Sequence, residues 1–391
     1  MDDRIKTLMG RVEKITQTKS STRLSARESS IITRSNRKIT DILEKQRDRN
    51  HVSESEFLTT MKNPENVVEF DDLHTYFFTD LGIVKAVDGV TFEIPKGASV
   101  GVVGESGCGK SVTALSLMQL VQRPQGQIVN GSIRFDGGDK VYEISKTPTK
   151  VMEKIRGGQI SMIFQEPMTS LNPVFRVGDQ IDEVVRLHNL EMNQEAVKAL
   201  SLKMIDMVGI ANNTGVYNMY PHELSGGMRQ RIMIAMALAC NPKLIIADEP
   251  TTALDVTIQA QILDLLRNLK DQINSSIMLI THDLGVIAEM ADYVVVMYAG
   301  RIVEKGTAEE VFHNPLHPYT VGLMASKPVV NREVERLYTI PGSVPNPISM
   351  PNYCYFKDRC ERRMPVCDGV YPKEVYVSPT HMVTCYHYIN D

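Results

Sequence analysis

The chain has 391 residues, of which 42% are hydrophobic and 23% are charged, a balance typical of a globular protein with a sizeable core. The formal net charge of -4 gives no general reason to expect nucleic-acid binding. No apolar run approaches the roughly 20 residues of a bilayer-spanning helix, and the charged start Met1-Asp2-Asp3-Arg4 is unlike a secretory signal. We therefore expect a cytosolic protein unless a partner holds it at a membrane.

Residues 1–64 differ in composition from the rest of the chain. They are rich in Ser, Thr, Arg and Lys, contain one aromatic residue, Phe57, and have only short amphipathic patches such as Ile39–Leu43. This composition favours a charged extension that is disordered or loosely helical. A basic arm that touches lipid headgroups or a partner subunit is an alternative without further support in the sequence.

Residues 65–313 have the pattern of an α/β domain. Short apolar runs that end in polar or turn residues predict strands at Ala98–Val103, Ile160–Phe164, Leu244–Asp248, Ile277–Thr281 and Tyr293–Met297. Helices are predicted at Ser111–Val121, Ser225–Ala239 and Thr257–Leu269. Strands that alternate with helices predict a mostly parallel sheet covered on both faces, with ligands beyond the carboxyl ends of the strands.

A phosphate-binding motif, G-x-x-x-x-G-K-[ST], follows the first of these strands and opens a helix. Its predicted ligand-binding residues are Gly104, Glu105, Ser106, Gly107, Cys108, Gly109, Lys110, Ser111 and, in the first turn of the helix, Val112. The glycines let successive backbone N–H groups face a β-phosphate. Lys110 is expected to reach the β- and γ-phosphates and the Ser111 hydroxyl to bind Mg²⁺, whereas Cys108 has no expected chemical role. The complete match in this context argues against a chance glycine-rich turn.

Two adjacent carboxylates lie where the strand Leu244–Asp248 ends. Asp248 is expected to hold Mg²⁺ through water, and Glu249 to polarise the attacking water. Adjacent carboxylates alone are more often a solvated strand end, but the phosphate loop favours the functional interpretation. Thr281-His282-Asp283 repeats the arrangement on another strand, so that His282 can bond the γ-phosphate and the water. The predicted catalytic residues are therefore Glu249, His282 and Lys110.

The segment Leu224-Ser225-Gly226-Gly227-Met228-Arg229-Gln230-Arg231 matches the signature motif of ABC ATPases, which this chain resembles from about residue 67 to residue 313. Ser225, Gly226 and Gly227 open a second helix and form a second anion-binding start. In the family, the signature of one subunit completes the nucleotide site of another. The resemblance therefore implies a P-loop ABC-type nucleotide-binding domain that binds ATP between itself and a second ATPase subunit, a paralogue.

The resemblance adds further site residues. Gln165 resembles the loop glutamine that contacts Mg²⁺ and senses the membrane subunit, and Asp255, after Ala253-Leu254, resembles the segment that crosses the dimer interface. Among the consecutive aromatics 76–78, register with the family favours Phe77 for stacking on adenine. The implied cofactors are ATP and Mg²⁺.

Two segments resemble the oligopeptide/dipeptide import ATPases in particular. They are the loop Phe164-Gln165-Glu166-Pro167-Met168-Thr169-Ser170-Leu171-Asn172-Pro173, and the tail with His313-Asn314-Pro315-Leu316-His317-Pro318-Tyr319-Thr320 and Ile340-Pro341-Gly342. The resemblance implies a peripheral subunit on the cytoplasmic face of the cell membrane, whose ATP-driven dimerisation powers peptide import. Its partners would be two transmembrane permease subunits and, indirectly, an extracytoplasmic substrate-binding protein. Nickel or another small solute is the alternative cargo.

Residues 314–391 are rich in Pro and Tyr and hold four of the six cysteines, Cys354, Cys360, Cys367 and Cys385. Four thiolates suit Zn²⁺ or an iron–sulfur cluster, and four buried thiols are the plain alternative. The spacing lacks the tight C-x2–4-C pair that structural zinc sites usually have. Some members of the peptide-import family carry a [4Fe–4S] cluster on matching cysteines, so the resemblance favours this cluster, in a docking role, over Zn²⁺.

Two other classes of function fit the sequence less well. A non-transport ABC ATPase of ribosomes or DNA is expected to join two ATPase domains or to carry a long coiled coil between the motifs, and the sequence has neither. An iron–sulfur enzyme with an ancillary ATPase would turn over redox substrates without membrane partners. We therefore expect a transport ATPase with no nucleic-acid partner.

Overall fold

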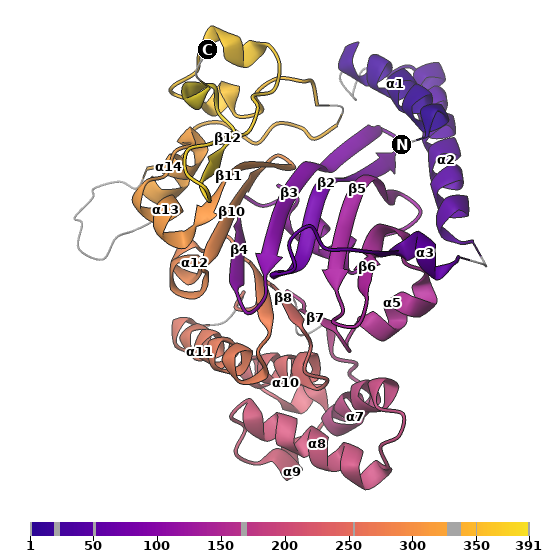
Figure 1. The fold of residues 1–391 in the computed structure, drawn as a ribbon, viewed down its shortest axis with the longest axis vertical. Helices are drawn as coiled ribbons and strands as arrows, with labels where there is room; N and C mark the ends of the chain where they lie inside the picture. Colours follow the sequence, from indigo (N-terminus) through magenta and orange to yellow (C-terminus); the bar gives the residue numbers. More distant parts are fainter. Residues whose placement is uncertain are drawn as a thin grey trace.

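The computed structural model describes residues 2–18, 24–49, 52–165, 170–252, 255–326, 338–348 and 350–389. Two sheets occupy the middle of the molecule. The helices α7 (Val177–His188), α8 (Gln194–Met207) and α9 (Asn213–Tyr217) form the end opposite to the C-terminal region (Figure 1). None of the helices in these ranges is long and apolar enough to cross a bilayer.

The larger sheet contains the predicted parallel strands, in the order β12-β13-β11-β10-β4-β9-β8-β7. Every residue of β4, β7, β8 and β9 is buried, as expected for strands covered on both faces. The parallel strands are β4 (Ser99–Val103), β7 (Ile160–Ile163), β8 (Leu244–Asp248), β9 (Ser276–Ile280) and β10 (Tyr293–Tyr298). All five strand predictions are confirmed to within a residue or two.

The strands at one edge of this sheet are antiparallel, and the outermost two come from the C-terminal region. The strand β11 (Arg301–Thr307) pairs with β10 on one side and with β13 (Met382–Val383) on the other, and β12 (Val375–Tyr376) pairs with β13. The C-terminal region is therefore built onto the same sheet as the nucleotide-binding motifs.

The smaller sheet is wholly antiparallel, so the prediction of a mostly parallel sheet describes only one of the two sheets. Its order is β1-β6-β5-β2-β3. The bounds are β1 (Leu58–Thr59), β2 (Asn66–Thr79), β3 (Gly82–Pro95), β5 (Gly126–Asp136) and β6 (Val141–Glu143). In β3, the buried Val90, Phe92 and Ile94 alternate with Thr91 and Glu93, the two-residue period of a strand with one face on a core.

Helices cover both sheets. Between the sheets, α4 (Lys110–Leu117) packs into a core shared with β2, β3 and β8. On the other face of the large sheet lie α10 (Gly226–Leu238), α11 (Val256–Ile273) and α12 (Leu284–Met290). Further short helices in the described part of the chain are α3 (Glu54–Phe57), α5 (Thr149–Ile155), α13 (Ala308–His313) and α14 (Pro318–Ala325).

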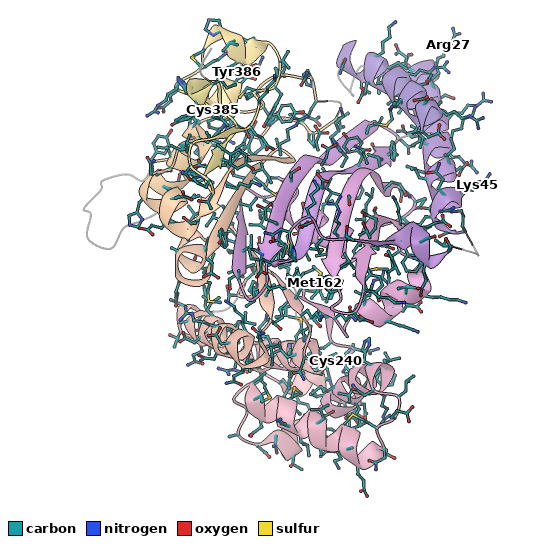
Figure 2. All side chains as sticks on the ribbon, viewed as in Figure 1. Arg27, Lys45, Met162, Cys240, Cys385 and Tyr386 are labelled. Carbon is teal, nitrogen blue, oxygen red and sulfur yellow. The ribbon has the colours of Figure 1, made fainter. Side chains whose placement is uncertain are left out.

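The N-terminal extension, expected to be disordered or loosely helical, contains two well-formed helices, α1 (Asp3–Thr18) and α2 (Ala26–Arg47). Their apolar stripes pack with the outer face of the small sheet in one core, made of Ile5, Met9, Val12, Ile32, Ile39, Tyr76, Phe78, Ile83 and Val129. Exposed basic residues such as Arg27 and Lys45 lie on the other side of these helices (Figure 2). The apolar residues are too sparse to dominate the composition, yet their helical spacing suffices to cover the sheet.

Candidate nucleotide site

The phosphate loop joins the end of β4 to the start of α4. Gly104, Gly107 and Gly109 have φ values of 151°, 78° and 103°, in the region that favours glycine. A Cβ atom on Gly104 would lie 2.2 Å from the carbonyl oxygen of Met297, and one on Gly109 would lie 2.2 Å from that of Ala86. A Cβ atom on Gly107 would meet nothing within 4 Å, so the loop backbone is open there to a ligand such as a phosphate.

Lys110 lies inside the loop. Its Nζ donates to the carbonyl oxygens of Gly104, at 2.7 Å, and Glu105, at 3.1 Å, and the residue is only 5% exposed. Cys108 is buried, and burial raises the pKa of its thiol. The side chain of Val112 packs into the core between the sheets.

The two oxygens predicted to bind Mg²⁺ lie next to each other. Ser111 Oγ donates to Asp248 Oδ1 at 3.0 Å, across the space between α4 and the end of β8. Burial raises the pKa of Asp248, and the hydrogen bond from Ser111 only partly opposes this. A hydroxyl and a carboxylate are oxygen donors of the kind that Mg²⁺ prefers, so the residues fit the ion.

Gln165, Glu249 and His282 meet where three neighbouring strands end. Glu249 Oε1 lies 3.2 Å from His282 Nδ1, and Glu249 Oε2 accepts from Gln165 Nε2 at 3.1 Å and from Thr252 Oγ1 at 2.8 Å. Burial acts to raise the pKa of Glu249, but hydrogen bonds from Thr252 and His282 outweigh it and the pKa is lowered. A carboxylate that is ionised and hydrogen-bonded can orient a water molecule. The structure thus brings together three predicted residues from separate motifs.

The signature motif opens α10 as predicted. Ser225 is the N-cap of this helix, and its Oγ accepts from Met228 N at 3.3 Å. Ser225 and Gly226 are exposed, and a Cβ atom on Gly226 would meet nothing within 4 Å. Gly227 is more closely packed, since a Cβ atom on it would lie 3.1 Å from the side chain of Ile258. This helix start is therefore open to an anion that approaches from outside the chain.

Asp255 has a local role that the sequence analysis missed. It is the N-cap of α11, and its Oδ1 accepts from Ile258 N at 2.9 Å. The carboxylate is exposed, and the next residue, Val256, is 82% exposed. Asp255 lies two residues before the predicted helix Thr257–Leu269, and an aspartate next to a helix start is the signal that could have identified this cap. The other interface residues predicted here, Ala253 and Leu254, lie outside the described residues.

The three consecutive aromatic residues of β2 face different sides of the small sheet. Tyr76 and Phe78 are buried in the core beneath α1 and α2, with exposed fractions of 5% and 4%. Phe77 lies between them and is half-buried on the opposite face, because successive side chains of a strand alternate. Of the three, Phe77 is therefore the one that remains accessible to a nucleotide base.

A contact from the C-terminal region to the phosphate loop was not predicted. The Arg359 guanidinium forms a two-point ion pair with the Glu105 carboxylate, and Glu105 N donates to Tyr319 Oη at 2.8 Å. These residues are more than 200 positions apart in the chain, with separations of 254 and 214 residues. No local pattern could have indicated the contact.

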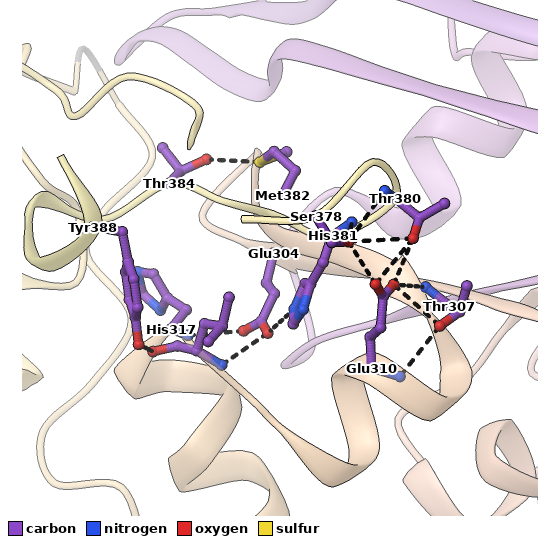
Figure 3. Close-up of polar contacts among 11 residues, drawn as sticks. Glu304, Thr307, Glu310, His317, Ser378, Thr380, His381, Met382, Thr384 and Tyr388 are labelled. Atoms are coloured by element: carbon purple, nitrogen blue, oxygen red, sulfur yellow. Dashed lines mark hydrogen bonds and ion pairs between the residues drawn. The ribbon is translucent and has the colours of Figure 1, made fainter. Parts of the chain in front are cut away.

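The C-terminal region is fixed to the large sheet by two buried or half-buried carboxylates (Figure 3). Glu304 is fully buried, accepts from the backbone N–H groups of Leu316 and His317 at 2.9 and 2.8 Å, and lies 2.8 Å from His381 Nε2. Burial acts to raise the pKa of Glu310, but hydrogen bonds led by that from Ser378 lower it to about 2. These contacts tie the last strand to the rest of the sheet.

His317 gives this anchor a pH dependence. The residue is 2% exposed, and burial lowers its pKa to about 4, although the charge of Glu304 opposes this shift. The unfolded chain, with a histidine pKa near 6.5, binds the proton more readily, so the free energy of unfolding should fall by about 2–3 kcal/mol as the pH falls from about 6.5 to about 4.

A His317→Asn variant should show a weaker pH dependence. His317 Nδ1 accepts a hydrogen bond from Tyr319 N at 3.1 Å. Asparagine keeps an acceptor oxygen for this bond and does not titrate. Urea unfolding of both proteins at pH 4.5 and pH 7.5 measures the difference. An unchanged difference between the two pH values would assign the effect to other groups.

The four C-terminal cysteines lie close to one another. Cys354 N donates to the carbonyl oxygen of Cys367 at 3.2 Å, and burial together with the charges of the other three thiols raises the pKa of Cys354 to about 12. Figure 2 places Cys385 in the C-terminal region, away from Cys240. Within the described ranges, however, no group of three or more His, Cys, Asp or Glu side chains is arranged to hold a metal ion. The four thiols suit the predicted cluster in the kind and number of donors.

The fold and the site define a P-loop ATPase of the ABC type. The ABC transporter family model matches residues 87–252, and the model for the C-terminal region of oligopeptide/dipeptide transporters matches residues 303–367. Among solved structures, the ATP-binding cassette MJ0796 in a dimeric post-hydrolysis state with ADP and Pi is 25% identical, with a TM-score of 0.55 over 62% of this chain and 98% of that chain.

Curated relatives are similar over most of their length. The oligopeptide transport ATP-binding protein AppD of Bacillus subtilis is 49% identical over 82% of this chain and 97% of the relative. The oligopeptide transport ATP-binding protein OppD of Salmonella typhimurium is 48% identical over 86% of this chain and 98% of the relative. The chain therefore belongs to the oligopeptide/dipeptide transport family of ABC transporter ATP-binding subunits, whose ATP hydrolysis is coupled to transport.

Proposed function

We propose that this chain powers the import of oligopeptides or dipeptides as one of two ATPase subunits on the cytoplasmic face of the cell membrane. The observation that carries the ATPase part is the meeting of Gln165, Glu249 and His282 beside the Ser111–Asp248 pair. The peptide cargo rests on the match of residues 303–367 and on the names of the relatives.

The predicted residues take the following roles in this proposal. The loop backbone from Gly104 to Val112 and the Lys110 ammonium bind the phosphates, and Phe77 stacks on adenine. Ser111, Asp248 and Gln165 hold Mg²⁺, which neutralises charge on the phosphate oxygens when it is bound. Glu249 accepts a hydrogen bond from the attacking water, and His282 orients Glu249 and contacts the γ-phosphate. The 3.2 Å contact between Glu249 and His282 and the lowered pKa of Glu249 support this division.

The second half of each nucleotide site comes from the other ATPase subunit. Ser225, Gly226 and Gly227 would bind the γ-phosphate of a nucleotide held by the partner, and Asp255 would lie at the dimer interface. Exposure of Ser225, Gly226 and Asp255 supports this role, because a buried helix start could not reach a ligand on another chain. ATP would then join the two subunits, and hydrolysis would release them.

The permease subunits would dock beside Gln165. A groove of about 280 Å³ in this part of the surface is lined mostly by apolar side chains, among them Leu120, Phe164, Leu171, Met233 and Met236. Phe164 is 40% exposed, and the nearby Phe175 is 53% exposed. Exposed apolar groups at one place are typical of a protein interface. A substrate-binding protein outside the cell would act on this chain only through the permeases, and no nucleic-acid partner is proposed.

The division into an N-terminal extension (1–64), an ATPase domain (65–313) and a C-terminal region (314–391) belongs to the same proposal. In the last of these, Cys354, Cys360, Cys367 and Cys385 would hold a [4Fe–4S] cluster, with Zn²⁺ as the alternative, in a docking role. The mutual proximity of the four thiols supports this. Burial raises the pKa of Cys354, so a bound metal would be needed to keep it ionised.

Anaerobic purification followed by iron, sulfide and zinc analysis tests the metal. The expected result is about four irons and four sulfides per chain. A Cys367→Ser variant should lose them, whereas Cys240→Ser, a change at a half-buried thiol far from the cluster, should not. If both variants keep their metal, or if the parent protein contains none, the cluster is contradicted.

Reconstitution with its membrane partners tests the function. In vesicles that contain the two permeases and both ATPase subunits, a peptide-loaded binding protein should stimulate ATP hydrolysis several-fold and drive peptide uptake. Stimulation by Ni²⁺ and not by peptides would favour the alternative cargo. ATP hydrolysis that is indifferent to any of these solutes would contradict the transport proposal.

A further inference from the structure

The strongest feature outside the predicted machinery is the environment of Arg359. Its side chain is 6% exposed, although it comes from the C-terminal region and not from a nucleotide-binding motif. Nη1 donates to Glu105 Oε2 at 2.6 Å and Nη2 donates to Glu105 Oε1 at 2.9 Å. Nε donates to the Pro341 carbonyl at 2.8 Å, and longer contacts of 3.4 Å reach Tyr298 Oη and the Ile340 carbonyl. All five N–H groups of the guanidinium therefore have an acceptor.

Glu105 connects this hydrogen-bond network to the phosphate loop. Its carboxylate binds Arg359, its N–H donates to Tyr319 Oη at 2.8 Å, and its carbonyl oxygen accepts from Lys110 Nζ at 3.1 Å. Tyr298 and Tyr319 are fully buried with ring centroids 4.7 Å apart, so the two hydroxyls sit on a rigid support. The second residue of the loop is thus held at side chain and backbone by groups from outside the loop.

We infer that Arg359 is a positioning residue for the ATPase reaction. Acting through Glu105, it holds the phosphate loop in the form that binds nucleotide and sets where the Lys110 ammonium lies. The inference rests on the proposed nucleotide site and deepens it, because it makes the C-terminal region part of the structure that determines ATP affinity. A two-point ion pair in a nearly buried place fixes both distance and orientation, which a lysine at the same position could not do.

Binding of Mg²⁺-ATP by the purified full-length chain tests this, with calorimetry for the Kd and thermal unfolding for stability. Arg359→Gln and Glu105→Gln should each raise the Kd about tenfold, because each leaves the other partner without its ion pair. The double variant should bind no more weakly than the single variants, since both changes remove the same interaction. Arg359→Lys should recover little of the affinity.

Arg363→Gln is the matched control. Arg363 also lies in the C-terminal region and pairs with Asp358 and Asp368, but its side chain is 43% exposed and does not contact the phosphate loop. Its Kd should stay within about twofold of the parent value. If Arg359→Gln fails to fold, Glu105→Gln, which alters only the loop side of the pair, still decides the question.

Two outcomes would overturn the inference. One is an unchanged Kd in Glu105→Gln, and the other is a double variant whose effect equals the product of the single effects, as expected when Arg359 only supports its own region. A parent chain that binds no ATP would instead contradict the proposed function itself.

Discussion

A Glu249→Gln variant should hydrolyse ATP about 10²–10³-fold more slowly than the parent chain while it still binds Mg²⁺-ATP. Of the three side chains that meet at the strand ends, only Glu249 is an anion that can accept a proton from water at neutral pH. Hydrogen bonds from Thr252 and His282 lower the pKa of this carboxylate. Glutamine keeps the size and one acceptor oxygen but not the charge. Steady-state phosphate release with the partner ATPase present, together with a binding isotherm, separates the two effects.

The same variant should accumulate as an ATP-bound pair of subunits, which size-exclusion chromatography with and without ATP can detect. Glu289→Gln is the control, because Glu289 pairs with Arg267 on the surface and is 54% exposed. Hydrolysis at the parent rate in Glu249→Gln would show that another group polarises the water.

Lys110→Ala is the second change with a large expected effect, and it should weaken ATP binding by about 10²-fold or more. The ammonium lies within the loop, and charge-assisted bonds to phosphate oxygens are roughly twice as strong as neutral hydrogen bonds. The substitution also leaves the carbonyl oxygens of Gly104 and Glu105 without the donor that they have now. Thermal unfolding of the same samples shows how much of the effect is loss of the folded loop.

A lysine on the surface provides the comparison for this prediction. Lys150 is exposed at the start of α5, and Lys150→Ala should bind ATP as the parent does. Near-normal affinity in Lys110→Ala would mean that the backbone of the loop carries the phosphates without the ammonium.

Local patterns were sufficient for the parts of the site that lie within a short stretch of chain. The buried strand β8 and the two carboxylates at its end are indicated by four apolar residues followed by Asp248 and Glu249. The phosphate loop is indicated by its glycines and by the helix that it opens. The Ser225 cap of α10 is likewise encoded by neighbours a few residues apart. Each of these features is stabilised mainly by interactions within its own window.

The antiparallel sheet and the N-terminal helices were harder to predict. In β2 and β3, pairing joins residues across a hairpin with several register shifts, so the alternation is interrupted. In α1 and α2, the apolar stripe is narrow, and Ile32 and Ile39 are buried by the tertiary packing of α2 with α1 and with the outer face of the small sheet. Composition averages over such a stripe and therefore favoured a disordered or loosely helical extension.

The sequence by itself determined the glycine-rich turn before α4 and the Ser225 cap at the start of α10, because both features use backbone geometry set by nearby residues. Only the tertiary structure decided that Gln165, Glu249 and His282 converge, that Phe77 and not its neighbours is accessible, and that Arg359 reaches Glu105 across 254 residues of chain. Contacts between such distant segments depend on how the sheets and the C-terminal region pack together. The loss of chain entropy on bringing these segments together is offset by the packing of the whole core and not by the residues in contact alone.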